Sequence, residues 1–161
     1  VLIIGKTEGH IDQSLFARTI LDEKNGPPPE VNLFNEKNNG ESILNLIDKG
    51  YVKSAHDISL GGLLVAISKM CIKGNKGIKI NKSKNLINEI EYFFAEDQGR
   101  YLIEINKEDL KEVTKILNKN SVHHEELGII TQNDMIINEK TKVTIDELKS
   151  YYTNWLSKYM S

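Results

Sequence analysis

The sequence predicts a single α+β domain in which helices pack against a mixed β-sheet of five or six strands. Apolar segments of strand length alternate with segments of helical periodicity, and only short polar breaks separate them. The length of 161 residues is typical of one domain. A chain of this size buries about 70% of the surface of its unfolded state, so residues 1–161 can form a core without disulfides.

The first part of the chain is expected to contain two strands and two helices. The strands are expected at residues 1–4 and 51–55, and the helices at residues 15–20 and 43–47. Ser14 is a suitable N-cap for the first helix, and the prolines at positions 27–29 end it because proline cannot continue a helix. Gly50 ends the second helix. The polar segment 22–40 is expected to be a loop, with part of it packed down through Val31, Leu33 and Phe34.

The clearest helix follows the second strand. Its apolar side chains recur at i, i+3, i+4, i+7, i+10 and i+11, and they are Leu60, Leu63, Leu64, Ile67, Met70 and Cys71. Ser59 is the expected N-cap, and Gly74 and Gly77 close the element. Cys71 is the only cysteine, so no disulfide framework exists and the thiol is expected to pack as a small hydrophobe. A reducing, cytoplasmic location fits this composition.

The second half of the chain continues the alternation. A strand is expected at residues 101–105, a helix follows Asn106 and Asp109, and short strands are expected at 127–131, 135–137 and 142–143. Thr144 and Glu147 have the spacing of a capping box that opens a terminal helix. The apolar stripe of this helix is assigned to the core and comprises Ile145, Leu148, Tyr152, Trp155, Leu156 and Tyr159. The adjacent His123 and His124 are assigned to a solvated loop and not to a metal site.

Charge and hydropathy exclude several classes of function. The formal net charge is −2 with acids and bases mixed along the chain, so no basic stripe for nucleic acid is present. No apolar run approaches the roughly 18 residues of a membrane span. The chain opens at Val1 in a strand-like segment, from which we expect it to be a piece of a longer protein.

The most specific stretch is Ser54–Leu63, where a strand is expected to turn into a helix. His56, Asp57 and Ser59 would lie beside a helix N-terminus, whose partial positive charge favours a phosphate or a carboxylate. Gly61 and Gly62 lack Cβ atoms, so a ligand or another backbone could approach closely. The same residue types also make ordinary turns and caps, and residue chemistry alone favours that simpler interpretation.

Two segments, Ala55–Leu63 and Phe94–Arg100, resemble the phosphoribosylformylglycinamidine synthase family of ATP-dependent ligases in purine biosynthesis. The resemblance is to the last C-terminal domain of the synthetase subunit, which belongs to the aminoimidazole ribonucleotide synthetase superfamily and contains two tandem copies of an N-domain and a C-domain. Residues 1–9, 26–28 and 52–57 match the second copy better than the first, so the resemblance covers nearly the whole chain. It implies a fold like the C-terminal domain of aminoimidazole ribonucleotide synthetase. The candidate residues near substrate or nucleotide are His56, Asp57, Ser59, Gly61, Gly62, Glu96, Asp97, Gln98 and Arg100.

Two departures from the family pattern point to a degenerate site. Leu60 stands where the family commonly has Asp, and Asp97 stands where a serine of the first copy contacts substrate. A second carboxylate beside Glu96 disfavours a phosphorylated ligand unless Arg100 compensates. Two roles are possible for Arg100: it could bind an external carboxylate or phosphate, or it could form an internal salt bridge.

The resemblance implies that ATP, magnesium and the catalytic groups belong to other domains of the parent enzyme, and no catalytic or metal-binding residue is assigned to this chain. The implied partners are those domains and a glutaminase subunit that supplies ammonia, and the isolated fragment is expected to be inactive. Two alternatives stay open. One is a domain of a selenophosphate synthetase or a thiamine-monophosphate kinase, which share part of the motif, and the other is a non-catalytic binding or assembly module.

Overall fold

The computed structural model describes residues 1–80 and 87–160, without the side chains of residues 156–158. Eight strands are found in this part: β1 (Leu2–Ile4), β2 (Val52–Asp57), β3 (Gly77–Ile80), β4 (Tyr101–Ile105), β5 (His124–Glu126), β6 (Gly128–Thr131), β7 (Asp134–Ile137) and β8 (Thr141–Thr144). The same part contains six helices: α1 (Leu15–Ile20), α2 (Leu33–Asp48), α3 (Gly62–Gly74), α4 (Glu89–Phe94), α5 (Leu110–Lys119) and α6 (Ile145–Met160).

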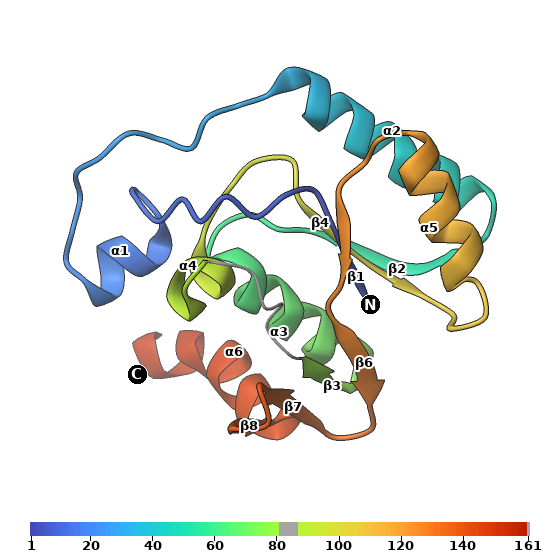
Figure 1. The fold of residues 1–161 in the computed structure, drawn as a ribbon. Coiled ribbons are helices and arrows are strands. Elements are labelled where there is room, and N and C mark those ends of the chain that lie inside the picture. The colour runs from blue at the N-terminus through green and yellow to red at the C-terminus, as the bar shows by residue number, and fades with distance from the viewer. Residues whose placement is uncertain (81–86, 161) are drawn as a thin grey trace.

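The strands form two sheets of four strands each (Figure 1). The first sheet has the order β2-β4-β1-β5 and is antiparallel throughout. The second has the order β6-β3-β7-β8 and is mixed, because β3 and β7 run parallel. The predicted α+β class is therefore confirmed, although the strands are divided between two sheets where the sequence suggested one.

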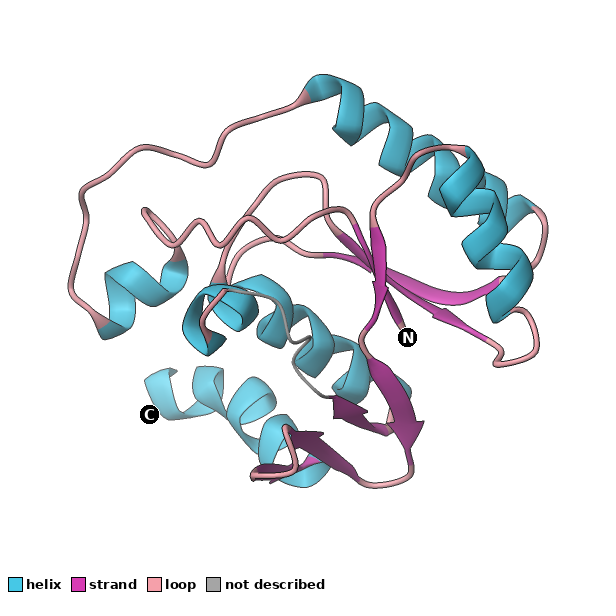
Figure 2. Cartoon of the chain, viewed as in Figure 1, coloured by secondary structure: helices cyan, strands magenta, loops and turns pink. Residues whose placement is uncertain are grey.

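The first sheet divides the core into two layers, with α2 and α5 on one side of it and α3 on the other (Figure 2). One cluster lies between the first sheet and helices α2 and α5, and it includes Leu2, Ile4, Leu46 and Leu117. The other surrounds α3, which packs between the two sheets. Ile3 belongs to this second cluster, so successive side chains of β1 point into different layers, as the pleat of a strand requires. Burial on both faces explains why residues 1–4 read as a continuous apolar run.

Helix α2 begins at Leu33 and not at residue 43, so the prediction of a loop over residues 22–40 is wrong for its last part. The side chain of Asn32 accepts a hydrogen bond from the Asn35 backbone at 3.0 Å and caps the helix. Polar residues fill this first half because much of it faces solvent. The expected packing of Val31, Leu33 and Phe34 is also wrong, since all three side chains are exposed.

Helix α3 begins at Gly62, so Leu60, the first residue of the predicted apolar stripe, lies before the helix. The Gly62 N–H donates to the Ser59 carbonyl at 2.9 Å, so residues 59–62 form a turn before the helix. The N-cap is Gly61, without a side-chain hydrogen bond, and the predicted capping by Ser59 is wrong. Leu60 is exposed on the turn, whereas Cys71 is buried as predicted. Burial raises the pKa of the Cys71 thiol to about 11, which is consistent with a packing role.

The C-terminal part departs most from the sequence prediction. His124 lies in β5, which pairs with β1, so it is not in a loop; His123 is exposed just before this strand. Thr144 and Glu147 form the predicted capping box, with reciprocal hydrogen bonds of 2.9 and 3.1 Å. The assignment of Tyr152, Trp155 and Tyr159 to the core is wrong, because these side chains are exposed. The side chain of Leu156 lies outside the described part of the structure.

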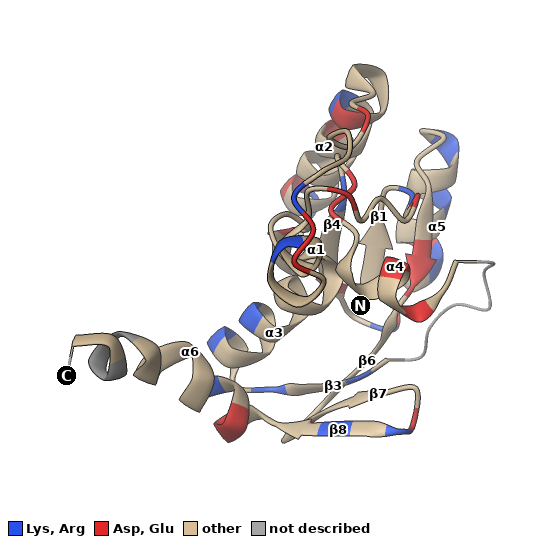
Figure 3. Ribbon diagram, turned by 90° about the vertical axis from the view of Figure 1, so that its left-hand side faces the viewer, with Lys and Arg blue, Asp and Glu red and all other residues tan. Residues whose placement is uncertain are grey.

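Helix α6 projects from the body of the domain, as Figure 3 shows. Its first residue, Ile145, is buried, and Leu148 packs against the core around α3. Beyond this point the aromatic side chains of the stripe are mostly exposed, so a continuous apolar stripe in the sequence is only partly covered. Within residues 1–80 and 87–160, no helix combines the length and apolarity needed to cross a membrane.

Candidate functional site

The two motif segments lie side by side because β2 pairs with β4. His56 is opposite Leu102 and Asp57 is opposite Tyr101, so the end of one strand meets the beginning of the other. The Ile58 N–H extends this contact by donating to the Arg100 carbonyl at 2.8 Å. The fold therefore brings together the turn that precedes α3 and the connection from α4 to β4. These are the positions at which the sequence placed the candidate site.

Glu96 lies at the N-termini of two helices. Its Oε1 accepts hydrogen bonds from the Gly61 N–H at 2.8 Å and from the Leu15 N–H at 2.7 Å. Gly61 is the N-cap of α3, and Leu15 is the first residue of α1. The partial positive charge at the start of α3 is thus met by a carboxylate of the protein itself.

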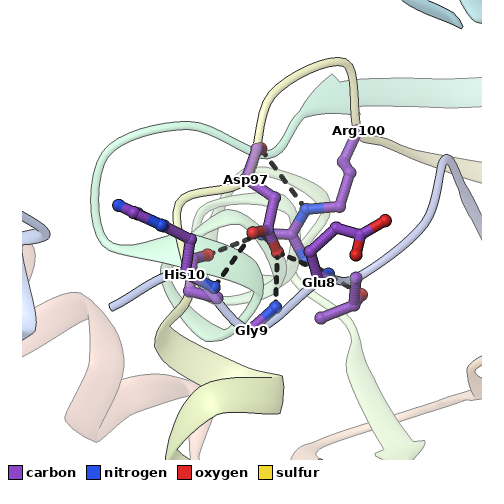
Figure 4. A network of polar contacts seen from close by, with 7 residues as sticks. Glu8, Gly9, His10, Asp97 and Arg100 are labelled. Carbon is purple, nitrogen blue, oxygen red and sulfur yellow. Dashed lines mark hydrogen bonds and ion pairs between the residues drawn. The ribbon is translucent and has the colours of Figure 1, made fainter. Parts of the chain in front are cut away.

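Asp97 binds the backbone of the loop that follows β1 (Figure 4). Its Oδ2 accepts from the N–H groups of Glu8 and Gly9 at 3.0 and 3.2 Å, and its Oδ1 accepts from the N–H of His10 at 3.0 Å. The residue is 5% exposed. Three converging amides are a typical environment for an anion, and here that anion is the Asp97 side chain.

Arg100 completes this cluster. Its Nη1 donates to Thr7 Oγ1 at 3.0 Å, Nη2 donates to the Ala95 carbonyl, and Nη2 lies 3.7 Å from Asp97 Oδ2. The residue is 1% exposed. Burial lowers the pKa of the guanidinium while the Asp97 charge raises it, and a guanidinium stays protonated in such a setting. Of the two alternatives that the sequence left open, the structure contains the internal salt bridge.

Gly62 allows the two segments to touch. Its φ is +71°, and a Cβ at this position would lie 2.7 Å from the Ala95 carbonyl oxygen. A larger residue would therefore clash with backbone that cannot move without disturbing Glu96 and Asp97. The close packing of α3 against residues 94–95 gives this glycine a structural reason, in agreement with the simpler interpretation of the sequence.

Of the remaining candidates, Asp57, Ser59 and Gln98 face solvent and His56 is partly exposed. His56 Nδ1 lies 2.6 Å from the Asp57 carbonyl oxygen and 3.3 Å from Asp57 Oδ1. The side chains of Asp57, Ser59 and Gln98 are exposed. These three and His56 lie near the buried cluster, but their polar groups remain accessible to an external molecule.

Magnesium and nucleotide phosphates, which the resemblance associates with the parent enzyme, do not fit the buried cluster. The oxygen atoms of Asp97 already accept three N–H groups, and Arg100 would repel a second cation beside them. Glu96 is similarly bound to two amides. Over residues 1–80 and 87–160, no group of three His, Cys, Asp or Glu side chains is arranged to hold a metal ion.

The sequence interpretation missed the groups that complete the cluster. The backbone amides of residues 8–10 are invisible to an argument from side chains, although Gly9, with a φ of +89°, marks a tight turn after a buried strand. Asn39 was missed as well: its Nδ2 donates to the Gly99 carbonyl at 2.9 Å, and the side chain is buried. Asn39 lies in the part of α2 that was predicted to be a loop, so no periodicity pointed to it.

Comparison with known proteins places this geometry in a family. The chain is 66% identical over 160 residues to the phosphoribosylformylglycinamidine synthase subunit PurL of Pelagibacter ubique. The alignment covers 99% of this chain and 22% of that protein. T. maritima PurL complexed with FGAR has a similar structure, with a TM-score of 0.77, 21% identity, and coverage of 92% of this chain and 27% of that chain. T. maritima PurL complexed with ATP has a TM-score of 0.67, 18% identity, and coverage of 91% and 25%.

These matches confirm the resemblance that the motifs indicated. At such low identities the solved structures bear on the fold alone, and the chain spans only 22% of the length of its relative from Pelagibacter ubique. Residues 1–138 match the family described as AIR synthase related protein, C-terminal domain. The matched part contains both motif segments and ends before β8 and α6. The chain therefore belongs to the AIR synthase related protein family and represents its C-terminal domain.

Proposed function

We propose that this chain is the C-terminal domain of the synthetase subunit of a phosphoribosylformylglycinamidine synthase. That enzyme is an ATP-dependent ligase of purine biosynthesis, which converts formylglycinamide ribonucleotide and glutamine-derived ammonia to formylglycinamidine ribonucleotide. The observation that carries the proposal is the 66% identity over 160 residues to a PurL subunit. It disfavours a selenophosphate synthetase, a thiamine-monophosphate kinase or a free-standing binding module.

Within this enzyme, the domain would have a supporting role. Glu96, Asp97 and Arg100 direct their charged groups at backbone and side chains of the same chain, so they act as positioning residues for the loop 7–10 and the start of α3. Their arrangement supports the interpretation of a degenerate copy of the site. The accessible residues His56, Asp57, Ser59 and Gln98 remain the candidates for contact with substrate or nucleotide bound mainly by another domain.

The remaining components of the reaction would come from outside residues 1–161. We assign ATP, magnesium and the catalytic groups to other domains of a longer multidomain polypeptide, and ammonia supply to a glutaminase subunit. The reaction activates a carbonyl oxygen by phosphorylation before ammonia displaces the phosphate, and such chemistry requires several phosphate-binding groups in a site that excludes water. A cytoplasmic location accords with this metabolic role.

The test compares the 161-residue chain with the full-length protein that carries it. Both are assayed for ATP- and ammonia-dependent formation of formylglycinamidine ribonucleotide, with a preparation without ammonia as control. We expect turnover by the full-length protein and none by the 161-residue chain. Turnover by the short chain would refute the supporting role, and a full-length protein with no such activity would refute the proposed function.

A further inference from the structure

The apolar stripe of α6 begins in the core and continues into solvent. Ile145 is 5% exposed and Leu148 packs on the core, but Tyr152, Trp155 and Tyr159 are 58%, 61% and 80% exposed. We call these last three residues the α6 aromatic face. They continue the same helical face as Ile145 and Leu148, on a helix that projects from the domain (Figure 3). A stripe with this pattern is typical of a helix that is covered along its whole length.

The α6 aromatic face is continuous with an apolar groove. Tyr152 lines this groove, which has a volume of about 580 Å³, together with Met70 of α3 and Ile130 of β6. Its floor includes Ile67 and Leu102, which are buried. Tyr and Trp side chains next to an apolar groove are the residue types that contribute most to protein interfaces. The surface can therefore accept apolar side chains of a partner.

The border of the groove is basic. Lys69, Lys73 and Lys76 line it, and the one carboxylate among its lining residues, Glu104, accepts a hydrogen bond from Ser54 Oγ at 2.7 Å. In the described part of the chain, no carboxylate lies within ion-pair distance of Lys69 or Lys73. Figure 3 shows lysines of α3 beside α6. Charge complementarity thus favours an occupant that carries Asp or Glu around an apolar centre.

The comparisons indicate where that occupant comes from. The match to the domain family ends at residue 138, so α6 lies outside the matched part. The alignment with Pelagibacter ubique PurL nevertheless extends over 160 residues, and it covers only 22% of that protein. Helix α6 therefore belongs to the region shared with a much longer polypeptide, most of which is absent from this structure.

We propose that the α6 aromatic face and the adjoining groove bind another part of the same polypeptide, through an apolar segment bordered by acidic residues. This inference rests on the proposed function, since it requires the chain to be one domain of a longer enzyme. It adds a specific docking surface on this domain and the chemistry of its occupant.

Photo-crosslinking in the full-length protein identifies the occupant. Benzoylphenylalanine replaces Trp155 in one variant and Ser150, on the opposite face of α6, in the control. We expect Trp155→benzoylphenylalanine to crosslink to an acidic, apolar peptide of the same polypeptide outside these 161 residues. Mixing ¹⁴N- and ¹⁵N-labelled protein separates this outcome from a link between two copies. Links only between copies, only to a different protein, only within the 161 residues, or none at all would overturn the inference.

Amide hydrogen exchange in the full-length protein gives an independent test. Loss of an interface aromatic weakens docking enough for Trp155→Ala to accelerate exchange in α6 by about 30-fold, while Ser150→Ala leaves it unchanged. Alanine has the higher helix propensity, and lost side-chain contacts within the helix are each worth only about 0.2–0.5 kcal/mol, so an acceleration of this size does not come from the helix itself. Unchanged exchange would contradict the docking. Ligase activity is measured on the same protein, because a full-length enzyme that is active without these effects retains the proposed function and loses only the inference.

Discussion

The two motif segments, Ala55–Leu63 and Phe94–Arg100, differ in the exposure of their charged side chains and in the groups that these side chains contact. In the half that contains His56 and Asp57, the carboxylate is 63% exposed and its contacts are with the neighbouring imidazole. In the half that contains Asp97 and Arg100, the carboxylate is 6% exposed and the guanidinium is fully buried. One half faces outward and the other holds loops together. A motif that identifies a family can therefore combine residues that preserve the fold with residues that remain available to a ligand.

The largest effect is expected from Asp97→Ala. This substitution leaves three N–H groups of loop 7–10 without their acceptor and the Arg100 charge buried without its partner. Removing one member of a buried ion pair costs about 3–5 kcal/mol, and we expect a loss of that size in the free energy of unfolding. Urea unfolding of the 161-residue chain measures it.

Asp57→Ala is the matched control for this prediction. It removes the same functional group from the exposed half of the motif, and we expect a change within about 0.5 kcal/mol. Similar losses for the two variants would show that exposure does not distinguish the two halves.

Gly62→Ala tests the contact between the halves. Alanine must adopt a φ of +71° and place its Cβ 2.7 Å from the Ala95 carbonyl oxygen. Strain of this kind costs about 1–3 kcal/mol. Gly74→Ala is the control, because no atom lies within 4 Å of the added Cβ and the φ is not positive. Thermal unfolding should show a marked decrease for the first variant alone; equal midpoints would mean that the contact is not tight.

The sequence was sufficient to predict the class of the fold because its strong signals are periodic. The regular apolar spacing from Leu63 to Cys71 and the capping box at Thr144 both correspond to observed structure. The start of α2 was missed because its polar residues face solvent and leave no apolar period. The exposure of Tyr152 was missed because periodicity shows which face of a helix is apolar, without showing what covers that face.

The sequence predicted where the candidate site lies, but it did not predict the hydrogen bonds that the site residues form. The order of residues places Ala55–Leu63 and Phe94–Arg100 at the ends of two strands, and strand pairing brings them together. The partners of Asp97 are backbone amides about ninety positions away in the sequence, as for His10, where the separation is 87 residues. Backbone amides are the same for every residue type except proline, so such partners leave no signal in the sequence. The sequence alone therefore could not decide whether Arg100 binds an external ligand or forms an internal salt bridge.

A smaller effect is expected from Glu96→Gln. The amide oxygen can still accept from Gly61 and Leu15, but the negative charge at two helix N-termini is lost. We expect a decrease of about 1 kcal/mol in the free energy of unfolding at low salt. The difference between wild type and variant should be smaller at high salt, because salt screens the interaction of the wild-type carboxylate with the helix N-termini. Urea unfolding at low and high salt measures both. A loss as large as that of Asp97→Ala would indicate that Glu96 belongs to the same buried unit.

The smallest effect on stability is expected from His56→Ala, and it separates the two halves most clearly. The polar contacts of the imidazole are with Asp57, so the free energy of unfolding should change by less than about 0.5 kcal/mol. If the exposed half contacts a ligand held by another domain, ligase turnover of the full-length protein will nevertheless fall. Asn154→Ala on α6 is an exposed control that should alter neither quantity. Unchanged turnover in His56→Ala would show that His56 has no part in the site, because its side chain would then affect neither folding nor activity.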